Sequence, residues 1–180
     1  MFWKILFENR KRGDEGSDAL LSIDGTDFRT RWINSLFYSY KFKKAGFRYE
    51  IGIGIRSGDI CWINGPYSPG VWNDDMIFGD ALVSELEEGE RVEADDGYRG
   101  HAPEYVRCPS CIANPPDSER MQQRVRSRHE TCNKRFKQWK ILREEYRHDL
   151  EEHGNVFCTI AVLTQLAFEN GEHLFEVEYE

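Results

Sequence analysis

The feature that most constrains the fold is an alternating segment, FRYEIGIGIRSGDICWING, at residues 47–65. Its apolar residues occupy every second position up to Ile55, which is the period of a β-strand with one buried face. Ser57-Gly58 interrupts this pattern, and a second apolar run follows at 60–63. Glycine in a turn between two such runs is typical of a β-hairpin. We therefore predict an antiparallel strand pair here and a fold built around a sheet.

Shorter elements are predicted on both sides of this hairpin. An apolar run at 19–23 (ALLSI) ends at Asp24 and a glycine turn, and RVEAD at 91–95 stops at Gly97, so we predict a short strand at each. The other expected elements are a helix opened by Asn73 or Asp74 and running to about Leu86, short strands at 105–108 and 174–177, a long helix at 118–146 and a helix at 155–168.

The order of these elements is strand, hairpin, helix, strand, short strand, helix, helix. Strands interposed with helices are typical of α/β folds in which parallel strands extend an antiparallel part. An RNase H-like sheet has this order. We therefore expect an α/β fold, with an RNase H-like mixed five-stranded sheet flanked by helices. The long helix should face the sheet with an apolar stripe at Val125, Cys132, Phe136 and Trp139.

A single domain is expected for residues 1–180, with a core at about 15–170, because this length suits one hydrophobic core. Hydrophobic residues make up 39% of the chain and aromatic residues 13%, which is a globular composition. The apolar runs after Met1 and at 159–168 are too short for a signal peptide or a membrane span. We therefore expect a soluble intracellular protein with no membrane contact.

The net charge of −8 hides a strongly basic segment. Residues 120–147 contain ten lysines and arginines but only three acids, whereas the rest of the chain has 14 basic and 29 acidic residues. Such a segment can neutralise phosphates while the remaining surface stays acidic and soluble. A solvated helical face gives the same pattern, and charge alone does not separate the two interpretations.

Three acids are candidates for metal chemistry. Asp24 closes the first predicted strand, Asp95 closes the strand after the first helix, and Glu130 lies in the long basic helix. Neighbouring strands end close together, and a helix packed across them can direct a third carboxylate to the same place. Three such oxygen donors suit hard divalent cations. Taken singly, each acid has another explanation, because Asp before Gly often forms a turn and a helical Glu often pairs with arginine.

Several motifs resemble those of one family, the PIF/Harbinger-like DDE transposases. SIDGTDF (22–28) resembles the family's IDGTH segment, VEADDGY (92–98) its LGDxGY motif, and RVRSRHETCNKRFKQWKIL (124–142) its RxxIExxFGxLKxRF helix. The segment at 39–66 looks like its second and third strands, and GVWNDDMIF (70–78) looks like the loop and Asp that open its next helix. The resemblance covers roughly residues 15–170, with the motifs in the family's order.

The resemblance implies a catalytic triad of Asp24, Asp95 and Glu130 that holds two Mg²⁺ or Mn²⁺ ions and performs DNA strand cleavage and transfer. Asp74 would be a supporting residue, and Asp96 is the nearest rival to Asp95 because it lies one register step away. Resemblance to eukaryotic elements also implies a nuclear protein.

The sequence departs from the family in two ways. Asp27 stands where the family has His, which adds negative charge near the expected metals. No helix-turn-helix is visible, so we expect no separate DNA-binding domain within the chain. A second protein would then supply specific DNA binding, and an oligomer is compatible with this. The alternative is a domesticated, non-catalytic DNA-binding or protein-interaction module that retains the fold.

Basic residues near these acids are predicted to contact DNA. Arg126, Glu130 and Lys134 are spaced by four residues on one helix face, where cations beside the acid would guide a phosphate. An exposed ion-pair ladder would give the same spacing. A second basic cluster at 41–48 is interleaved with aromatic residues, which suits backbone contact with base stacking or a half-buried strand face. The predicted contacts are Lys41, Lys43, Arg126, Lys134, Arg135 and Lys137.

The five cysteines leave a zinc site as a further hypothesis. Cys108, Cys111, His129 and Cys132 give the spacing C-x2-C-x17-H-x2-C, which is compatible with a closed tetrahedral site. Buried thiols without metal are the default expectation for an odd number of cysteines in a chain with no secretory signal.

Overall fold

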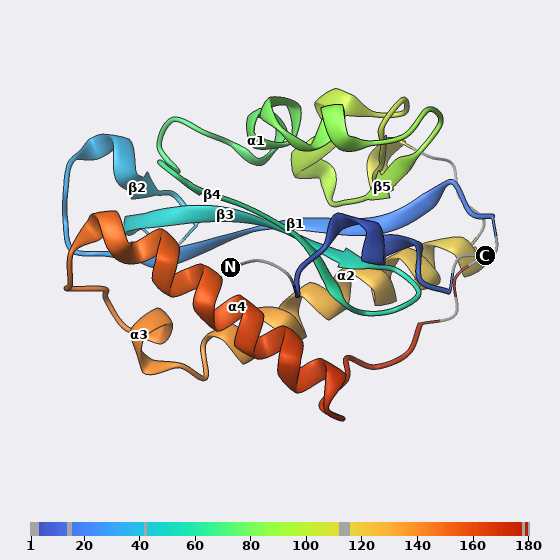
Figure 1. The fold of residues 1–180 in the computed structure, drawn as a ribbon. Coiled ribbons are helices and arrows are strands. Elements are labelled where there is room, and N and C mark those ends of the chain that lie inside the picture. The colour runs from blue at the N-terminus through green and yellow to red at the C-terminus, as the bar shows by residue number, and fades with distance from the viewer. Residues whose placement is uncertain (1–3, 14–15, 42, 112–115, 178, 180) are drawn as a thin grey trace.

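A mixed sheet forms the centre of the protein (Figure 1). The computed structural model describes residues 4–13, 16–41, 43–111, 116–177 and 179. The strands follow the order β2-β3-β1-β5-β6, and β4 also pairs with β3. β3 is antiparallel to β1, β2 and β4, whereas β1, β5 and β6 run parallel. The strands are β1 (Ala19–Arg29), β2 (Tyr38–Ser39), β3 (Lys44–Gly54), β4 (Ile60–Tyr67), β5 (Arg91–Glu93) and β6 (Val106–Arg107).

Helices cover both faces of this sheet, so the predicted α/β class is confirmed, and the arrangement is consistent with an RNase H-like fold. In Figure 1, α2, α3 and α4 lie on one face and α1 on the other. The α-helices are α1 (Asp74–Asp80), α2 (Pro116–Phe136), α3 (Lys140–Arg143) and α4 (His153–Glu169). Short 3-10 helices are η1 (Phe7–Lys11), η2 (Ser35–Phe37), η3 (Leu82–Glu85), η4 (Asp96–His101), η5 (Pro109–Cys111) and η6 (Leu150–Glu152).

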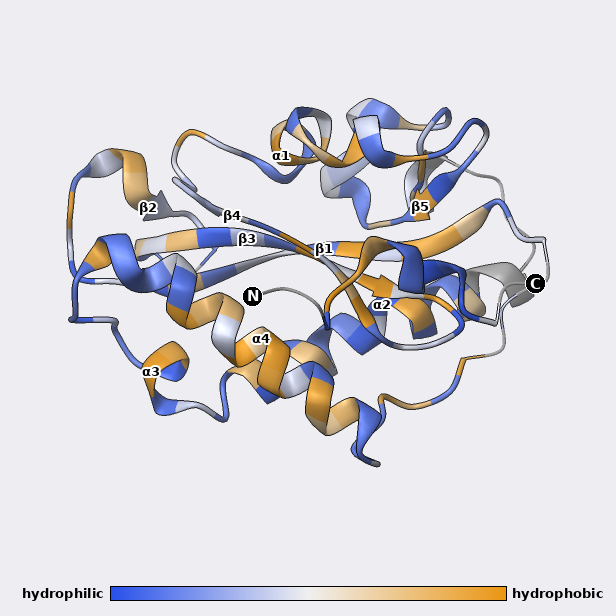
Figure 2. Cartoon of the chain, in the orientation of Figure 1, coloured by the Kyte–Doolittle hydropathy of each residue, from blue (hydrophilic) through white to orange (hydrophobic). Residues whose placement is uncertain are grey.

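The two larger of three hydrophobic clusters in the described residues hold these layers together, because side chains alternate across the sheet. One core packs β1 and the hairpin against α2 and α4 and includes Phe28, Tyr49, Phe136 and Phe157. The other lies on the α1 side and includes Leu21, Phe78, Val92 and Tyr98. Figure 2 shows that α4 is mainly hydrophobic, which fits its position against the first core.

Over the residues that the structure describes, the sheet has six strands rather than the expected five, because the two-residue strand β2 pairs with the start of β3. The edge strand predicted at 174–177 is wrong. This segment has no regular structure and runs beside α2, where Arg128 donates a hydrogen bond to the carbonyl of Phe175. The predicted hairpin is confirmed, with β3 pairing with β4.

The first strand is longer than predicted. Asp24 does not end β1, which continues to Arg29 because residues 24–29 pair with β3. The parallel pairing with β5 stops at Ser22, so Asp24 lies just beyond it. A pattern based only on apolar residues missed this extension, since hydrogen bonds to β3 continue through polar positions.

The two helices nearest the expected site also differ from prediction. Asn73 caps α1 by accepting from the backbone N–H of Met76, and this helix ends at Asp80 rather than near Leu86. The long helix divides after Phe136 into α2 and α3. Val125, Cys132 and Phe136 of the predicted stripe are buried, whereas Trp139 lies in the break and is 44% exposed. No helix in the described parts of the chain is long and apolar enough to cross a membrane.

Candidate active site

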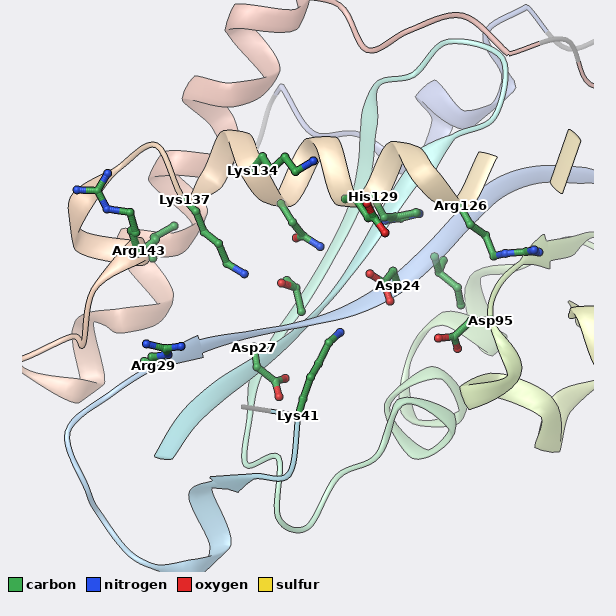
Figure 3. A pocket seen from close by; sticks show the side chains of 15 residues that line it. Asp24, Asp27, Arg29, Lys41, Asp95, Arg126, His129, Lys134, Lys137 and Arg143 are labelled. Carbon is green, nitrogen blue, oxygen red and sulfur yellow. The ribbon is translucent and has the colours of Figure 1, made fainter. Parts of the chain in front are cut away.

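A pocket of about 750 Å³ lies between β1 and α2. The three acids predicted from the sequence, Asp24, Asp95 and Glu130, all line it. Figure 3 shows Asp24 and Asp95 near one end of this pocket. The other lining residues are Ile23, Thr26, Asp27, Arg29, Lys41, Arg126, His129, Asn133, Lys134, Lys137, Leu142 and Arg143.

The register of the parallel strands explains why Asp24 and Asp95 meet. Ser22 of β1 pairs with Glu93 of β5, and each aspartate follows two residues later in its strand direction. Because side chains two residues apart point to the same face, both carboxylates are directed to the α2 side. The side chain of Asp95 also accepts a hydrogen bond from the N–H of Gly97 at 2.8 Å, which caps η4.

The acids of the pocket influence one another's ionisation. Burial, together with the charges of Asp95 and Asp74, raises the pKa of Asp24 to about 6, whereas the charge of Lys41 acts in the opposite direction. Lys41 is held nearby because its ammonium donates to the carbonyl of Gly25 at 3.3 Å. Asp24 is therefore ionised at pH 7 at a cost in stability, which a bound cation would relieve.

Asp74 reaches this cluster from the other side of β1. A Cβ atom on Gly25 would overlap its carboxylate, and a Cβ on Gly97 would lie 2.8 Å from Asp95 Oδ1 and 3.4 Å from Asp74 Oδ2. The two glycines therefore let the acids approach the backbone closely. Asp74 Oδ1 is buried and has no hydrogen-bond partner among the described residues, although Arg48 Nη1 lies 3.4 Å away.

Asp27 does not add free negative charge to the site, contrary to the expectation from sequence. Arg48 binds both of its carboxylate oxygens, at 2.7 and 3.0 Å, and Ser39 donates a further hydrogen bond at 2.5 Å. Because Arg48 on β3 lies opposite Asp27 on β1, the strand register creates this bidentate pair. Arg48 therefore neutralises one acid and contacts Asp74, a second one.

The wall opposite β1 is α2. Arg126, Glu130 and Lys134 line the pocket together, as their spacing predicts. His129 Nε2 lies 3.0 Å from the hydroxyl of Ser22, which joins the helix to the strand that carries Asp24. Burial lowers the pKa of His129 to about 3, so this imidazole is neutral. Glu130 itself is exposed, and among the residues that the structure describes no three His, Cys, Asp or Glu side chains are close enough to bind one metal ion without rearranging.

The predicted DNA contacts divide into two groups. Lys41, Arg126, Lys134 and Lys137 line the pocket. Lys43 is exposed outside it, and Arg135 forms an ion pair with Glu172 at 2.8 Å. Sequence analysis missed four polar residues of the pocket, Thr26, Arg29, Asn133 and Arg143. Asn133 lies on the predicted helix face, seven residues after Arg126, whereas nothing in the sequence showed that the chain turns back after α2.

Three of the four proposed zinc ligands can be placed, and they have separate surroundings. Cys108 packs in the core on the α1 side, and Cys132 packs in the core below α2 and α4. His129 is engaged with Ser22. The side chain of Cys111 lies outside the described residues. The arrangement therefore gives the zinc hypothesis no support.

The fold and pocket define a class: an α/β protein with a mixed RNase H-like sheet, a carboxylate cluster and a basic helix beside it. The model of the DDE superfamily endonuclease family matches residues 23–165, which is most of the chain, so the chain belongs to this family. Enzymes of this superfamily act on DNA and generally use divalent metals such as Mg²⁺. Neither the comparison with curated proteins nor that with solved structures gave a match.

Proposed function

We propose that this protein is a metal-dependent DNA endonuclease that cuts phosphodiester bonds and transfers strands as a transposase does. The observation that carries the proposal is the convergence of Asp24, Asp95 and Glu130 on one pocket. These three acids are the proposed catalytic residues and metal ligands, with Asp74 in support. The ordered motifs favour the PIF/Harbinger-like branch of the family.

The chemistry of the site fits a pair of hard divalent ions. The donors are carboxylate oxygens, which Mg²⁺ and Mn²⁺ prefer. Within the described residues Asp74 Oδ1 is buried without a hydrogen-bond donor, and burial together with repulsion from Asp95 and Asp74 raises the pKa of Asp24. The chemistry that two such ions supply when bound is activation of the attacking oxygen and stabilisation of the leaving oxygen.

The protein's own residues bind and orient the DNA strand. Lys41 and Lys137 extend toward the pocket from opposite walls, as Figure 3 shows. Their charges attract the phosphate backbone, which the acids alone would repel. Arg126 and Lys134 extend the basic wall along α2 on both sides of Glu130. The pair between Asp27 and Arg48 keeps one acid from adding to this repulsion.

The proposal includes the cellular setting. We place the protein in the nucleus, with DNA as its substrate and a second protein supplying recognition of specific DNA ends. An oligomer would suit cleavage of two ends. The competing function is a non-catalytic DNA-binding or protein-interaction module that retains the fold, and the exposed position of Glu130 is the observation that favours it.

The deciding experiment is nicking of supercoiled plasmid by the wild type and by Asp95→Asn in Mg²⁺ or Mn²⁺. Loss of groups that only orient metal ligands costs about 10–100-fold in activity, so loss of a ligand should cost at least 100-fold. The matched control is Asp96→Asn. Asp96 is exposed and accepts a hydrogen bond from the N–H of Ser110 outside the pocket, so this variant should retain activity within a few-fold.

Metal-dependent nicking that survives Asp95→Asn unchanged would contradict the mechanism. A wild type that binds DNA but never cuts it would favour the non-catalytic module. Equal losses in the Asp95 and Asp96 variants would indicate a structural effect of the turn rather than metal ligation.

A further inference from the structure

Basic residues gather at the end of the pocket that lies away from the aspartates. Asp24 and Asp95 lie toward one end with Arg126 beside them, whereas Arg29, Lys137 and Arg143 gather at the other, as Figure 3 shows. The proposed metal site accounts for the two aspartates. The basic end lies beyond the carboxylates and requires a different explanation.

The fold brings the two arginines of this end together. After α3, Tyr146 forms backbone hydrogen bonds with Arg29 and Arg31, where β1 ends. Leu142 is 2% exposed and anchors α3 in the core beneath. Arg143 at the end of α3 is thereby held beside the last residue of β1. The resulting bridge between Thr30 and Tyr146 is part of the folded backbone and does not depend on the arginine side chains.

Neighbouring cations act on Lys137. Burial lowers the pKa of Lys137, and the charges of Lys41 and Arg29 lower it further, although Asp27 and Asp24 act in the opposite direction. Within the described residues Lys137 forms no ion pair, and its ammonium lies 5.9 Å from the centre of the Phe28 ring.

The charge of Arg143 is weakly compensated in the described part of the chain. Its ion pair there is with Glu144, at 3.9 Å, where both side chains are more than half exposed and the pair contributes little. Asp27 is already bound by Arg48. Such a group of cations, facing a pocket, suits an anion that the substrate supplies.

We propose that Arg29, Lys137 and Arg143 form a phosphate-binding subsite that holds the substrate strand at a phosphate flanking the one that is cut. This inference rests on the proposed function and assigns the direction in which the strand leaves the carboxylates. A pocket of about 750 Å³ has the size of a small-molecule site and suits a short stretch of one strand rather than a duplex. Phosphates recur every ~3.4 Å of helix axis in each strand, so a strand seated at the acids presents further phosphates to the basic end.

The test measures DNA binding without cleavage. The double variant Arg29→Gln/Arg143→Gln is compared with wild type by fluorescence anisotropy of a labelled single-stranded oligonucleotide, in chelator or Ca²⁺, over a series of salt concentrations. Each lost phosphate contact on a single strand lowers the slope of log K against log salt by about 0.7, so the slope should fall by about 1.4. The affinity at low salt should fall at least tenfold.

Two variants serve as controls. Arg147→Gln removes a cation whose side chain is 81% exposed and which does not line this pocket, so it should leave the slope unchanged. Arg29→Lys/Arg143→Lys keeps the charges and should restore most of the slope. Thermal unfolding of each variant shows that it is folded before binding is compared.

Shortened substrates test the direction. Oligonucleotides centred on the cleavage site are trimmed from the 5′ or the 3′ side, and the effect of the double Gln variant should disappear for trimming from one side only. The proposal is overturned if this variant behaves like Arg147→Gln, if its loss is independent of trimming, or if the wild type binds no DNA. Millimolar inorganic phosphate that displaces DNA completely would also overturn it, because that result indicates an isolated anion site.

The test of the phosphate-binding subsite can fail independently of the test of the proposed nuclease activity. Asp24→Asn should bind the oligonucleotide with the wild-type slope while failing to nick plasmid. A protein that nicks but has no asymmetric subsite would refute this inference alone. A protein with the subsite that never nicks would refute the proposed catalysis alone.

Discussion

Asp24→Asn should stabilise the metal-free protein while abolishing its activity. In the folded protein the pKa of Asp24 is about 6, against an ordinary value of 3.8. One pKa unit corresponds to about 1.36 kcal/mol, so ionised Asp24 lowers the free energy of unfolding by at most about 3 kcal/mol at pH 7.5. For a chain of this length that is about 6–12 °C in melting temperature.

The pH dependence of this effect follows from linkage. Between pH 3.8 and 6 the folded protein binds more protons at Asp24 than the unfolded chain, so wild-type stability falls as pH rises through this window. The advantage of Asp24→Asn should therefore be near zero below pH 3.8, about half of its maximum near pH 5, and constant above pH 7. Urea unfolding in chelator at pH 5.0 and 7.5 measures it.

The control is Asp96→Asn, since a hydrogen bond from Ser110 lowers the pKa of that exposed carboxyl and the substitution should not stabilise. Added Mn²⁺ should raise the melting temperature of the wild type and not that of Asp24→Asn, because ligand binding to the folded state stabilises it. An Asp24→Asn protein no more stable than wild type at pH 7.5, or an advantage that does not change with pH, would refute the argument.

Three further predictions concern the support of the site. Glu50→Gln should have a higher free energy of unfolding than wild type, because burial raises the pKa of Glu50 to about 8. The difference should widen from pH 4.5 to pH 8, where it reaches about 5 kcal/mol. Urea unfolding across this range measures it, and a difference that does not change with pH would contradict the prediction. Arg48→Met should cost about 3–5 kcal/mol at pH 7 by leaving Asp27 buried and unpaired, and adding Asp27→Asn should recover part of the loss in the same assay. Ser22→Ala should lower the free energy of unfolding by about 1–3 kcal/mol, because it removes the hydrogen-bond partner of His129. It should also raise the Mn²⁺ concentration needed for half-maximal nicking. An unchanged Mn²⁺ dependence would show that this hydrogen bond does not position the site.

Local periodicity predicted the hairpin and the α/β class because each strand and helix buries a face of its own. The meeting of Asp24 and Asp95 was also predictable, since each acid lies two residues beyond the last paired residue of two neighbouring parallel strands. The pairing of Asp27 with Arg48 was not, because it depends on the register between β1 and β3, which separate sequence segments do not reveal.

The basic end of the pocket was missed for a similar reason. Arg29 and Arg143 are far apart in the sequence and meet only because the chain turns back after α2 and pairs with the end of β1. The helical pattern continued through this break because the residues beyond it have helical propensity. Asp74 was recognised by motif, but its position against Gly25 depends on how α1 packs on the sheet.

Buried contacts of the neighbouring residues on α2 fix the backbone position of Glu130. Arg128 is buried on the other side of α2 and donates hydrogen bonds to the carbonyls of Ile55 and Phe175, while His129 contacts Ser22. These contacts join α2 to the hairpin, to the C-terminal segment and to β1, so a shift of the helix would break several buried hydrogen bonds. The exposed Glu130 side chain has no such restraint. We therefore expect metal binding to complete the site by rotation of this side chain toward Asp24 and Asp95, with α2 and β1 keeping their present relation.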